Sequence, residues 1–257
     1  MTGHPETDRI DLAKIELNFE GFRRLARDAS LSPHERIGFP DSYRAGYEPL
    51  ILADIRRKVP ALDRKGQLII DIGPGCANLP RMICDLCAAN DNRLLLVDSQ
   101  EMLEQLPDGP GIIKVVGSFP DNFDAVRQAA GGLADGLICY SVLHYMFVDT
   151  NPFLVIDRSI QLLSEGGAAL FGDIPNHSKR RRFFSSPTGV RFHQEFTQSD
   201  TPPPAPGTGA EAGKIDDAVL AGLLLRAQQA GCDAYLVPQS PDLPMANRRD
   251  DLLIRKP

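Results

Sequence analysis

Several features of membrane and secreted proteins are missing from this chain of 257 residues. No stretch approaches the roughly 20 apolar residues that a transmembrane helix needs. Residues 1–10 are polar and lack the apolar core of a signal peptide. The five cysteines are an odd count, which argues against a disulfide framework and fits reduced thiols. These absences predict a cytoplasmic protein without a membrane partner.

An excess of positive charge is also missing, because the formal net charge is -6. An acidic chain lacks the basic surface on which broad nucleic-acid binding depends, so no nucleic-acid partner is expected. Cys84 and Cys87 form a lone Cys-x-x-Cys pair, and no second pair with ligand spacing accompanies it. We therefore expect a structural role for this pair and no metal site.

Between residues 67 and 173, short apolar runs alternate with stretches of helical character. Each run is bounded by turn residues, which is typical of parallel strands buried on both faces. The helical stretches supply the crossovers, so the pattern predicts a doubly wound, mostly parallel α/β sheet. The expected strands are Leu68–Ile72, Leu94–Val97, Ile112–Val116, Gly136–Tyr140 and Ala168–Phe171.

The segments around this core predict two further features. Residues 1–60 are expected to form a helical N-terminal cap on an α/β domain of residues 61–257, with helices over 11–29 and about 42–58. Residues 174–214 interrupt the alternation and predict a long, partly mobile insertion after the fifth strand. A helix over 216–230 and a final antiparallel hairpin, formed by 234–237 and 250–255, complete the expected fold.

A glycine turn follows the first strand, and an acid follows the second. The first strand runs into Gly73-Pro74-Gly75, where glycines allow positive φ and a close approach to a ligand. Asp98 ends the second strand, where a carboxylate can accept both hydroxyls of a ribose. The alternative is that Asp98 caps the helix that begins near Ser99.

A strand, glycine turn and ribose acid suit either a nicotinamide dinucleotide or S-adenosylmethionine. The dinucleotide fingerprint Gly-x-Gly-x-x-Gly requires a last glycine, but Asn78 occupies that position. Asp71 precedes the glycines and would repel a diphosphate, whereas it suits the cationic sulfonium and the amino-acid group of S-adenosylmethionine. The acid therefore favours methyl transfer.

Five motifs in this order resemble those of the class I S-adenosylmethionine-dependent methyltransferases. They are Asp71–Gly75, Asp98, Val116–Pro120, Asp135–His144 and Leu162–Gly167. Two departures are Ala77, where a third glycine is common, and Ser118, where an Asp is frequent. The resemblance implies a Rossmann-like seven-stranded sheet in the order three-two-one-four-five-seven-six. It also implies cofactor contacts by Asp71, Gly73, Pro74, Gly75, Asp98, Ser99, Gly117, Ser118, Phe119, Tyr140 and Ser141.

Residues 37–44 and 173–180 resemble, more narrowly, methyltransferases of bacterial surface-polysaccharide and sugar-modification pathways. A hydroxyl acceptor benefits from a general base. His144, after the fourth strand, is the first candidate for that base, and Asp173, at the end of the fifth, is the second; the alternatives are a packed histidine and a turn cap. Candidate substrate contacts are Tyr43, His177, Arg180, Arg181 and His193.

The sequence thus predicts methyl transfer to an oxygen or nitrogen of a small molecule, with a sugar or nucleotide-sugar as one option. The basic run Lys179–Arg182 would recognise an anionic acceptor from a lid formed by 174–214. The alternative is a solvated basic face or a contact in a homo-oligomer. Rival functions are a nicotinamide-dependent oxidoreductase and an inactive cofactor-binding protein with the same fold.

Overall fold

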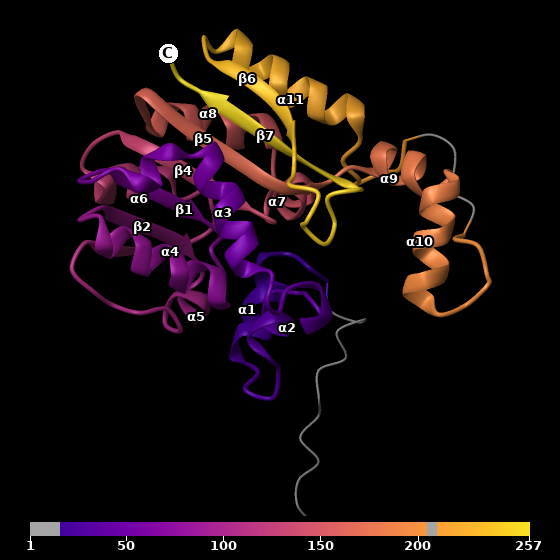
Figure 1. The fold of residues 1–257 in the computed structure, drawn as a ribbon. Helices are drawn as coiled ribbons and strands as arrows, with labels where there is room; N and C mark the ends of the chain where they lie inside the picture. Colours follow the sequence, from indigo (N-terminus) through magenta and orange to yellow (C-terminus); the bar gives the residue numbers. More distant parts are fainter. Residues whose placement is uncertain (1–15, 205–209) are drawn as a thin grey trace, which may run out of the picture.

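The computed structural model describes residues 16–204 and 210–257, and a seven-stranded sheet in the order β3-β2-β1-β4-β5-β7-β6 runs through it (Figure 1). Strands β1 to β5 pair in parallel, and β7 is antiparallel to both β5 and β6. This confirms the predicted sheet and the terminal hairpin. The strands are β1 Leu68–Ile72, β2 Arg93–Asp98, β3 Ile112–Val116, β4 Ala134–Tyr140, β5 Leu163–Pro175, β6 Asp233–Pro238 and β7 Arg249–Arg255.

Helices cover both faces of the sheet because successive strand residues point to opposite sides. Ile70 and Leu95 pack in the core that α6, α7, α8 and α11 cover, whereas Ile69 and Leu94 pack in the core beneath α3, α4 and α5. The helices are α3 Glu48–Lys58, α4 Asn78–Ala89, α5 Gln100–Leu103, α6 Phe123–Ala130, α7 Leu143–Asp149, α8 Pro152–Leu162 and α11 Asp217–Gln229. Cys84 and Cys87 are buried on α4 within the second core.

Strand β5 is longer than the predicted run Ala168–Phe171. It begins at Leu163, so the expected turn before the strand lies within its first residues. Gly166 has a φ of 75° and donates to the carbonyl of Lys256 at 2.9 Å, while the amide of Lys256 donates to the carbonyl of Gly167 at 3.0 Å. The glycine pair therefore makes an irregularity that pairs with the end of the chain.

The N-terminal cap is more broken than predicted. The helix expected over 11–29 is shorter in the described residues: α1 runs over Phe19–Arg27, and Asn18 caps it by accepting from the amide of Gly21 at 2.8 Å. Residues 11–15 of that prediction lie outside the described part. The helix expected over 42–58 is wrong in its first half. A short 3-10 turn, η2 Asp41–Tyr43, precedes α3, and Gly46 at a φ of 84° separates them. The remaining cap elements are α2 Pro33–Arg36 and η3 Pro60–Asp63.

The insertion after β5 has regular structure that the sequence did not predict. It contains two helices, α9 His177–Phe184 and α10 Pro187–Thr197. Each has a side-chain cap, from Asn176 and Ser186 respectively, and Pro187 stands at the first helical position, where its missing amide costs nothing. Residues 205–209 of the predicted insertion lie outside the described residues. Figure 1 shows α10 standing away from the sheet, joined to it through α9.

No helix in the described ranges is both long and apolar enough to cross a membrane.

Candidate functional site

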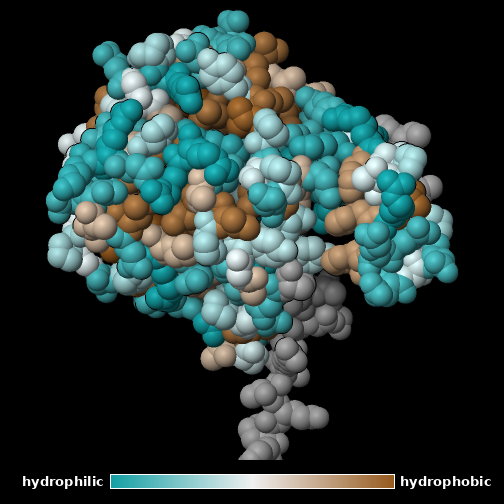
Figure 2. All heavy atoms as spheres, viewed as in Figure 1, coloured by the Kyte–Doolittle hydropathy of each residue, from teal (hydrophilic) through white to brown (hydrophobic). Residues whose placement is uncertain are grey.

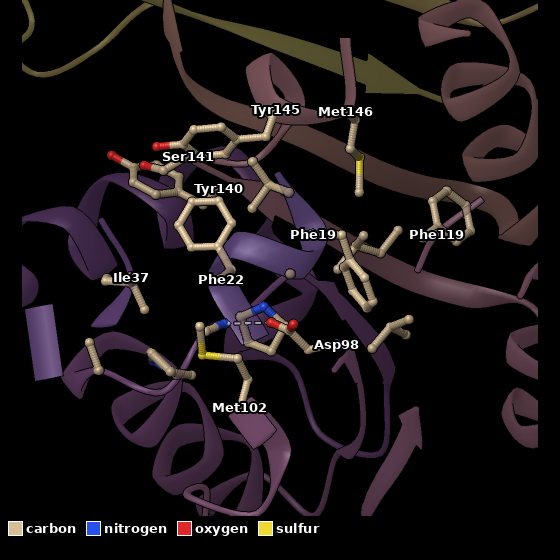
Figure 3. A pocket seen from close by; sticks show the side chains of 18 of the residues that line it. Phe19, Phe22, Ile37, Asp98, Met102, Phe119, Tyr140, Ser141, Tyr145 and Met146 are labelled. Carbon is tan, nitrogen blue, oxygen red and sulfur yellow. Dashed lines mark hydrogen bonds between the residues drawn. The ribbon is translucent and has the colours of Figure 1, made fainter. Parts of the chain in front are cut away.

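A cavity of about 360 Å³ opens at the carboxyl ends of β1 to β4, and the N-terminal cap closes its other side. In Figure 3, Tyr140, Ser141 and Tyr145 gather at one end, Asp98 and Met102 lie at the other, and the Phe22 ring lies between them. We call this the first cavity. The predicted cofactor residues that line it are Gly73, Pro74, Gly75, Asp98, Gly117, Ser118, Phe119, Tyr140 and Ser141.

The turn after β1 has no room for side chains. Gly73 and Gly75 have φ values of 68° and 69°, a region that L residues rarely adopt. A Cβ on Gly73 would lie 2.7 Å from a methyl of Val142, and one on Gly75 would lie 2.7 Å from a methyl of Ile37. The two glycines therefore let the turn fit between β4 and the cap while its backbone lines the cavity.

Asp98 is oriented by the backbone around it. Its Oδ2 accepts from the amide of Gly75 at 3.0 Å, and its Oδ1 accepts from the amide of Ser99 at 2.7 Å. Burial raises the pKa of Asp98 to about 6. The helix cap of α5 is Ser99, whose Oγ accepts from the amide of Met102. Capping is thus the work of Ser99, which does not line the cavity, and Asp98 remains the acid that faces it.

Asp71 is placed differently from its predicted role. It is buried within β1 and does not line the cavity. Burial, together with the nearby charge of Asp98, raises its pKa to about 8. Asp71 therefore does not reach the first cavity in this structure, and its contact with a cofactor stays a prediction.

Asp173 lies at the centre of a buried polar network. Arg44 Nη2 is 2.7 Å and Arg249 Nη1 is 3.1 Å from its Oδ2, and Ser141 Oγ donates to the same oxygen. Gln239 Nε2 donates to Oδ1 at 3.2 Å. Burial acts to raise the pKa of Asp173, but the charges of Arg249 and Arg44 outweigh it and hold the pKa below its usual value. A carboxylate so paired is a weak base, which favours a positioning role over the catalytic one expected.

His144 also departs from the expected arrangement. It is half-buried on α7, its ring lies 3.9 Å from that of Tyr145, and it does not line the first cavity. Burial, reinforced by the charge of Arg249, lowers the pKa of His144 to about 3, so the imidazole is neutral near pH 7. Its buried Nδ1 has no hydrogen-bond partner among the described residues.

The sequence analysis missed a polar wall that the cap contributes to the first cavity. His34 Nε2 lies 2.6 Å from Glu48 Oε1, and its Nδ1 lies 2.8 Å from Asp41 Oδ1. His34, Arg44 and Glu48 all line the cavity. Arg44 and Glu48 lie in the segment expected to be helical over 42–58, but helical spacing does not show which face meets a ligand, and His34 lies outside both expected helices.

The predicted substrate residues separate into two groups. Tyr43, Arg180 and His193 line a second cavity, of about 910 Å³, between α10 and the β6–β7 loop. His177 and Arg181 do not line it; His177 Nδ1 lies 3.7 Å from Glu211 Oε2. Arg181 Nη2 donates to Ser178 Oγ at 3.3 Å.

Two of the four residues of the basic run are paired with acids. Lys179 Nζ lies 2.7 Å from Asp250, and Arg182 is bonded to Asp217. The four charges therefore do not form one anion-binding surface, which corrects the sequence-based interpretation. Of these four residues, Arg180 alone lines one of the two cavities, the second. Within residues 16–204 and 210–257, no cluster of three or more metal-ligating side chains occurs.

Comparison with solved structures identifies the fold. The plantazolicin methyltransferase BpumL, solved with a triazolic desmethylPZN analog and SAH, aligns over 93% of this chain and 96% of its own, at 13% identity and a TM-score of 0.58. An O-methyltransferase family protein from Burkholderia thailandensis aligns over 93% of this chain at 17% identity and a TM-score of 0.51. The pyocyanin biosynthetic protein PhzM aligns over 93% at 15% identity and a TM-score of 0.52.

This chain spans 62% of the length of each of the last two proteins. No protein-family model matches the sequence, and no curated protein has a significant sequence match to it. At identities this low, the likeness establishes the architecture: the chain has the α/β fold of these methyltransferases. What its site does is argued from its own residues.

Proposed function

We propose that this protein transfers a methyl group from S-adenosylmethionine to an oxygen or nitrogen of a small molecule. The observation that carries the proposal is the first cavity, where a glycine turn and a half-buried, backbone-oriented Asp98 meet at the carboxyl ends of β1 and β2. Ligands of open α/β sheets bind at this edge, near the point where the strand order reverses. Here β1 lies between β2 and β4, so the reversal falls at the glycine turn.

The residues of the first cavity fit the nucleoside part of this cofactor. Asp98 would accept hydrogen bonds from the two ribose hydroxyls. The Gly73–Gly75 turn leaves its backbone accessible where any Cβ would collide with Val142 or Ile37. Met102 and Phe119 supply apolar surface for a planar base at the same end of the cavity. Apolar contacts could therefore hold the base even though Ser118 stands where an Asp is frequent.

The polar wall of the cap fits the amino-acid part. Arg44 is buried, and its Nε has no hydrogen-bond partner among the described residues, so this N–H can donate to a carboxylate. Glu48 is buried beside His34 and offers a carboxylate to an ammonium group. Both charges of a zwitterion would then have an opposite charge in the cavity, which offsets the cost of desolvating them.

Bound S-adenosylmethionine supplies a methyl group that its sulfonium already activates. The chain must mainly hold an acceptor atom in line with that methyl, about 3–3.5 Å away. Tyr145 and Phe22, whose rings are 4.7 Å apart, help to exclude water from this part of the cavity. His144 keeps an unprotonated nitrogen, but its low pKa makes it a weak base and it does not line the first cavity. Alignment therefore supplies most of the catalysis in this proposal.

The narrower proposal is a sugar or nucleotide-sugar acceptor. Its support is that the two segments with the narrower resemblance, 37–44 and 173–180, supply Arg44, Asp173 and Arg180 to the cavity region. Arginine suits phosphate because its planar fork bonds two oxygens at once.

Isothermal titration with S-adenosylhomocysteine tests the proposal. We expect one binding site per chain and a rise in the thermal midpoint when the ligand is present. The same measurements with NAD and NADP serve as the rival arm and should show no effect. Folded protein that binds neither S-adenosylmethionine nor S-adenosylhomocysteine, or that binds a dinucleotide in their place, would overturn the proposal.

A further inference from the structure

The second cavity has an aromatic wall built by the two helices of the insertion. The Phe183 ring lies 5.1 Å from Phe184 and 5.5 Å from Phe192, and Phe192 stacks on Phe196 at 6.2 Å with an interplanar angle of 7°. Tyr43 of the cap extends this row, 6.0 Å from Phe196. The space-filling view shows apolar surface on this lobe, which stands out from the body (Figure 2). Phe196 remains 59% exposed, so the row is not buried as a core.

Two arginines lie against these rings. The guanidinium carbon of Arg180 lies 5.4 Å from the centre of the Phe184 ring. That of Arg248 lies 5.9 Å from both Phe184 and Phe192. Both arginines line the second cavity, Arg180 as an exposed residue and Arg248 as a half-buried one. The cavity thus presents planar apolar faces and two planar cations together.

Arg180 and Arg248 differ from three nearby basic residues, each of which is paired with an aspartate. Lys179, Arg182 and Arg249 each form an ion pair with an aspartate. Within the described ranges, neither Arg180 nor Arg248 has a carboxylate within ion-pair distance; Asp242 also lines the cavity but pairs with neither. Burial is the largest cause that lowers the pKa of Arg248; the charges of Arg249 and Arg180 add to it, while those of Tyr43 and Asp173 oppose it. An anion placed between Arg180 and Arg248 would weaken the repulsion between these two charges.

The second cavity shares a wall with the first. Tyr43 lines the second cavity and Arg44 lines the first. Gln239 lines the second cavity, and its Nε2 lies 3.4 Å from the hydroxyl of Tyr140, which lines the first. A molecule in the second cavity would therefore lie next to the network of Arg44, Asp173 and Gln239, at the end of the first cavity where Ser141 lies.

We propose that the second cavity binds an aromatic anion, a carboxylate or phosphate on a planar ring system, whose charge meets Arg180 and Arg248 and whose ring stacks on Phe184 and Phe192. The aromatic anion would be the methyl acceptor, and this part of the inference rests on the proposed function. Guanidinium groups bind such anions through two parallel hydrogen bonds. The aromatic row adds a stacking surface that a purely aliphatic anion would not use.

The test uses 2-naphthoate as the probe, with 2-naphthamide as its neutral counterpart of similar shape. The chain contains no tryptophan, so naphthyl fluorescence is readily resolved and its anisotropy reports binding. We expect the naphthoate to bind at least about tenfold more tightly than the naphthamide. Arg180→Gln and Arg248→Gln should each weaken naphthoate binding about tenfold or more. Arg182→Gln is the matched control, because Arg182 lies on the same helix but pairs with Asp217, and it should change the affinity less than twofold.

Binding of S-adenosylhomocysteine, measured on every variant, separates this inference from the proposed function, and thermal unfolding reports that each variant is folded. If naphthoate binding depends on Arg180 and Arg248 but S-adenosylhomocysteine does not bind, the cavity assignment is supported and methyl transfer is not. If S-adenosylhomocysteine displaces the naphthoate competitively, the probe lies in the first cavity and the inference is overturned. Equal affinity for the amide, no difference from Arg182→Gln, or no binding of either 2-naphthoate or 2-naphthyl phosphate would also overturn it.

Discussion

The two cavities are built by opposite means. The first is formed at the ends of buried strands, and its turn and its acid are held by backbone amides, as at Gly75 and Asp98. The second lies beyond the sheet, between the two helices of the insertion, the β6–β7 loop and Tyr43 and Tyr47 of the cap, and its rings and arginines are side chains. A site held by backbone tolerates little change in the residues that shape it, whereas a site of side chains can change its ligand without changing the fold. We therefore expect the first cavity to carry the reaction and the second to carry selectivity.

The largest expected effect comes from the network between the cavities. Asp173→Ala would leave Arg44 and Arg249 buried without their carboxylate partner, and removing one partner of a buried ion pair costs about 3–5 kcal/mol. Urea unfolding measures this loss. Asp157→Ala is the control, because its pair with the half-exposed Arg226 should be worth less than about 1 kcal/mol. Equal losses in the two variants would show that the network does not hold the cavities together.

The second effect separates the first cavity from the second. Asp98→Ala should lose hydrogen bonds to two ribose hydroxyls, at about 1.5–3 kcal/mol each, so the affinity for S-adenosylhomocysteine should fall at least about tenfold. Binding of 2-naphthoate should not change. Asp124→Ala, at an exposed acid of α6, is the control for titration calorimetry. An unchanged affinity in a folded Asp98→Ala protein would remove Asp98 from the cofactor site.

A smaller effect tests whether the turn depends on glycine. Gly75→Ala would place a Cβ 2.7 Å from Ile37 at a φ of 69°. The left-handed conformation alone costs a residue with a Cβ about 1–2 kcal/mol. Thermal unfolding and titration with S-adenosylhomocysteine should both show the loss. Gly132→Ala, where an added Cβ meets nothing within 4 Å, should leave the affinity unchanged. Tight binding by both variants would mean that the turn adapts without its glycine.

The last prediction concerns pH. The folded pKa of Asp71 is about 8, above the ordinary 3.8, so between these values the folded chain holds a proton that the unfolded chain releases. Stability from Asp71 is therefore fully present below about pH 4 and is lost as the pH rises toward 8, by at most about 1.4 kcal/mol per pH unit. Asp71→Asn should unfold with a flatter dependence between pH 5 and 8. Urea unfolding across this range measures it, and identical slopes would show that Asp71 ionises freely.

The affinity for 2-naphthoate should stay constant between pH 6 and 9, in contrast to the unfolding stability, because the two arginines stay charged throughout this range. The contrast would distinguish a cavity beside buried acids from one lined by arginines. If S-adenosylhomocysteine and 2-naphthoate both stopped binding at the same pH, the two cavities would respond to a single titrating group.

Local sequence determined the strands and the glycine turn. Leu68–Ile72 and Ile112–Val116 form strands over the predicted residues, because short apolar runs between turns can be buried on both faces only within a sheet. The helix over 216–230 is likewise confirmed as α11, with Asp216 as its cap. The order of the strands agrees with the family resemblance; no single stretch of sequence specifies it.

Only the tertiary structure decided which charges meet. Arg44 and Asp173 are 129 positions apart, yet their side chains form an ion pair, and the consecutive basic residues of α9 turn to different partners. A helix rotates each residue by about 100°, so a run of charges in the sequence is spread around its axis. Arg180 and Arg248 lie beside the same row of rings because of how α9 packs against the β6–β7 loop. That packing follows from long-range burial, which spacing along the chain does not encode.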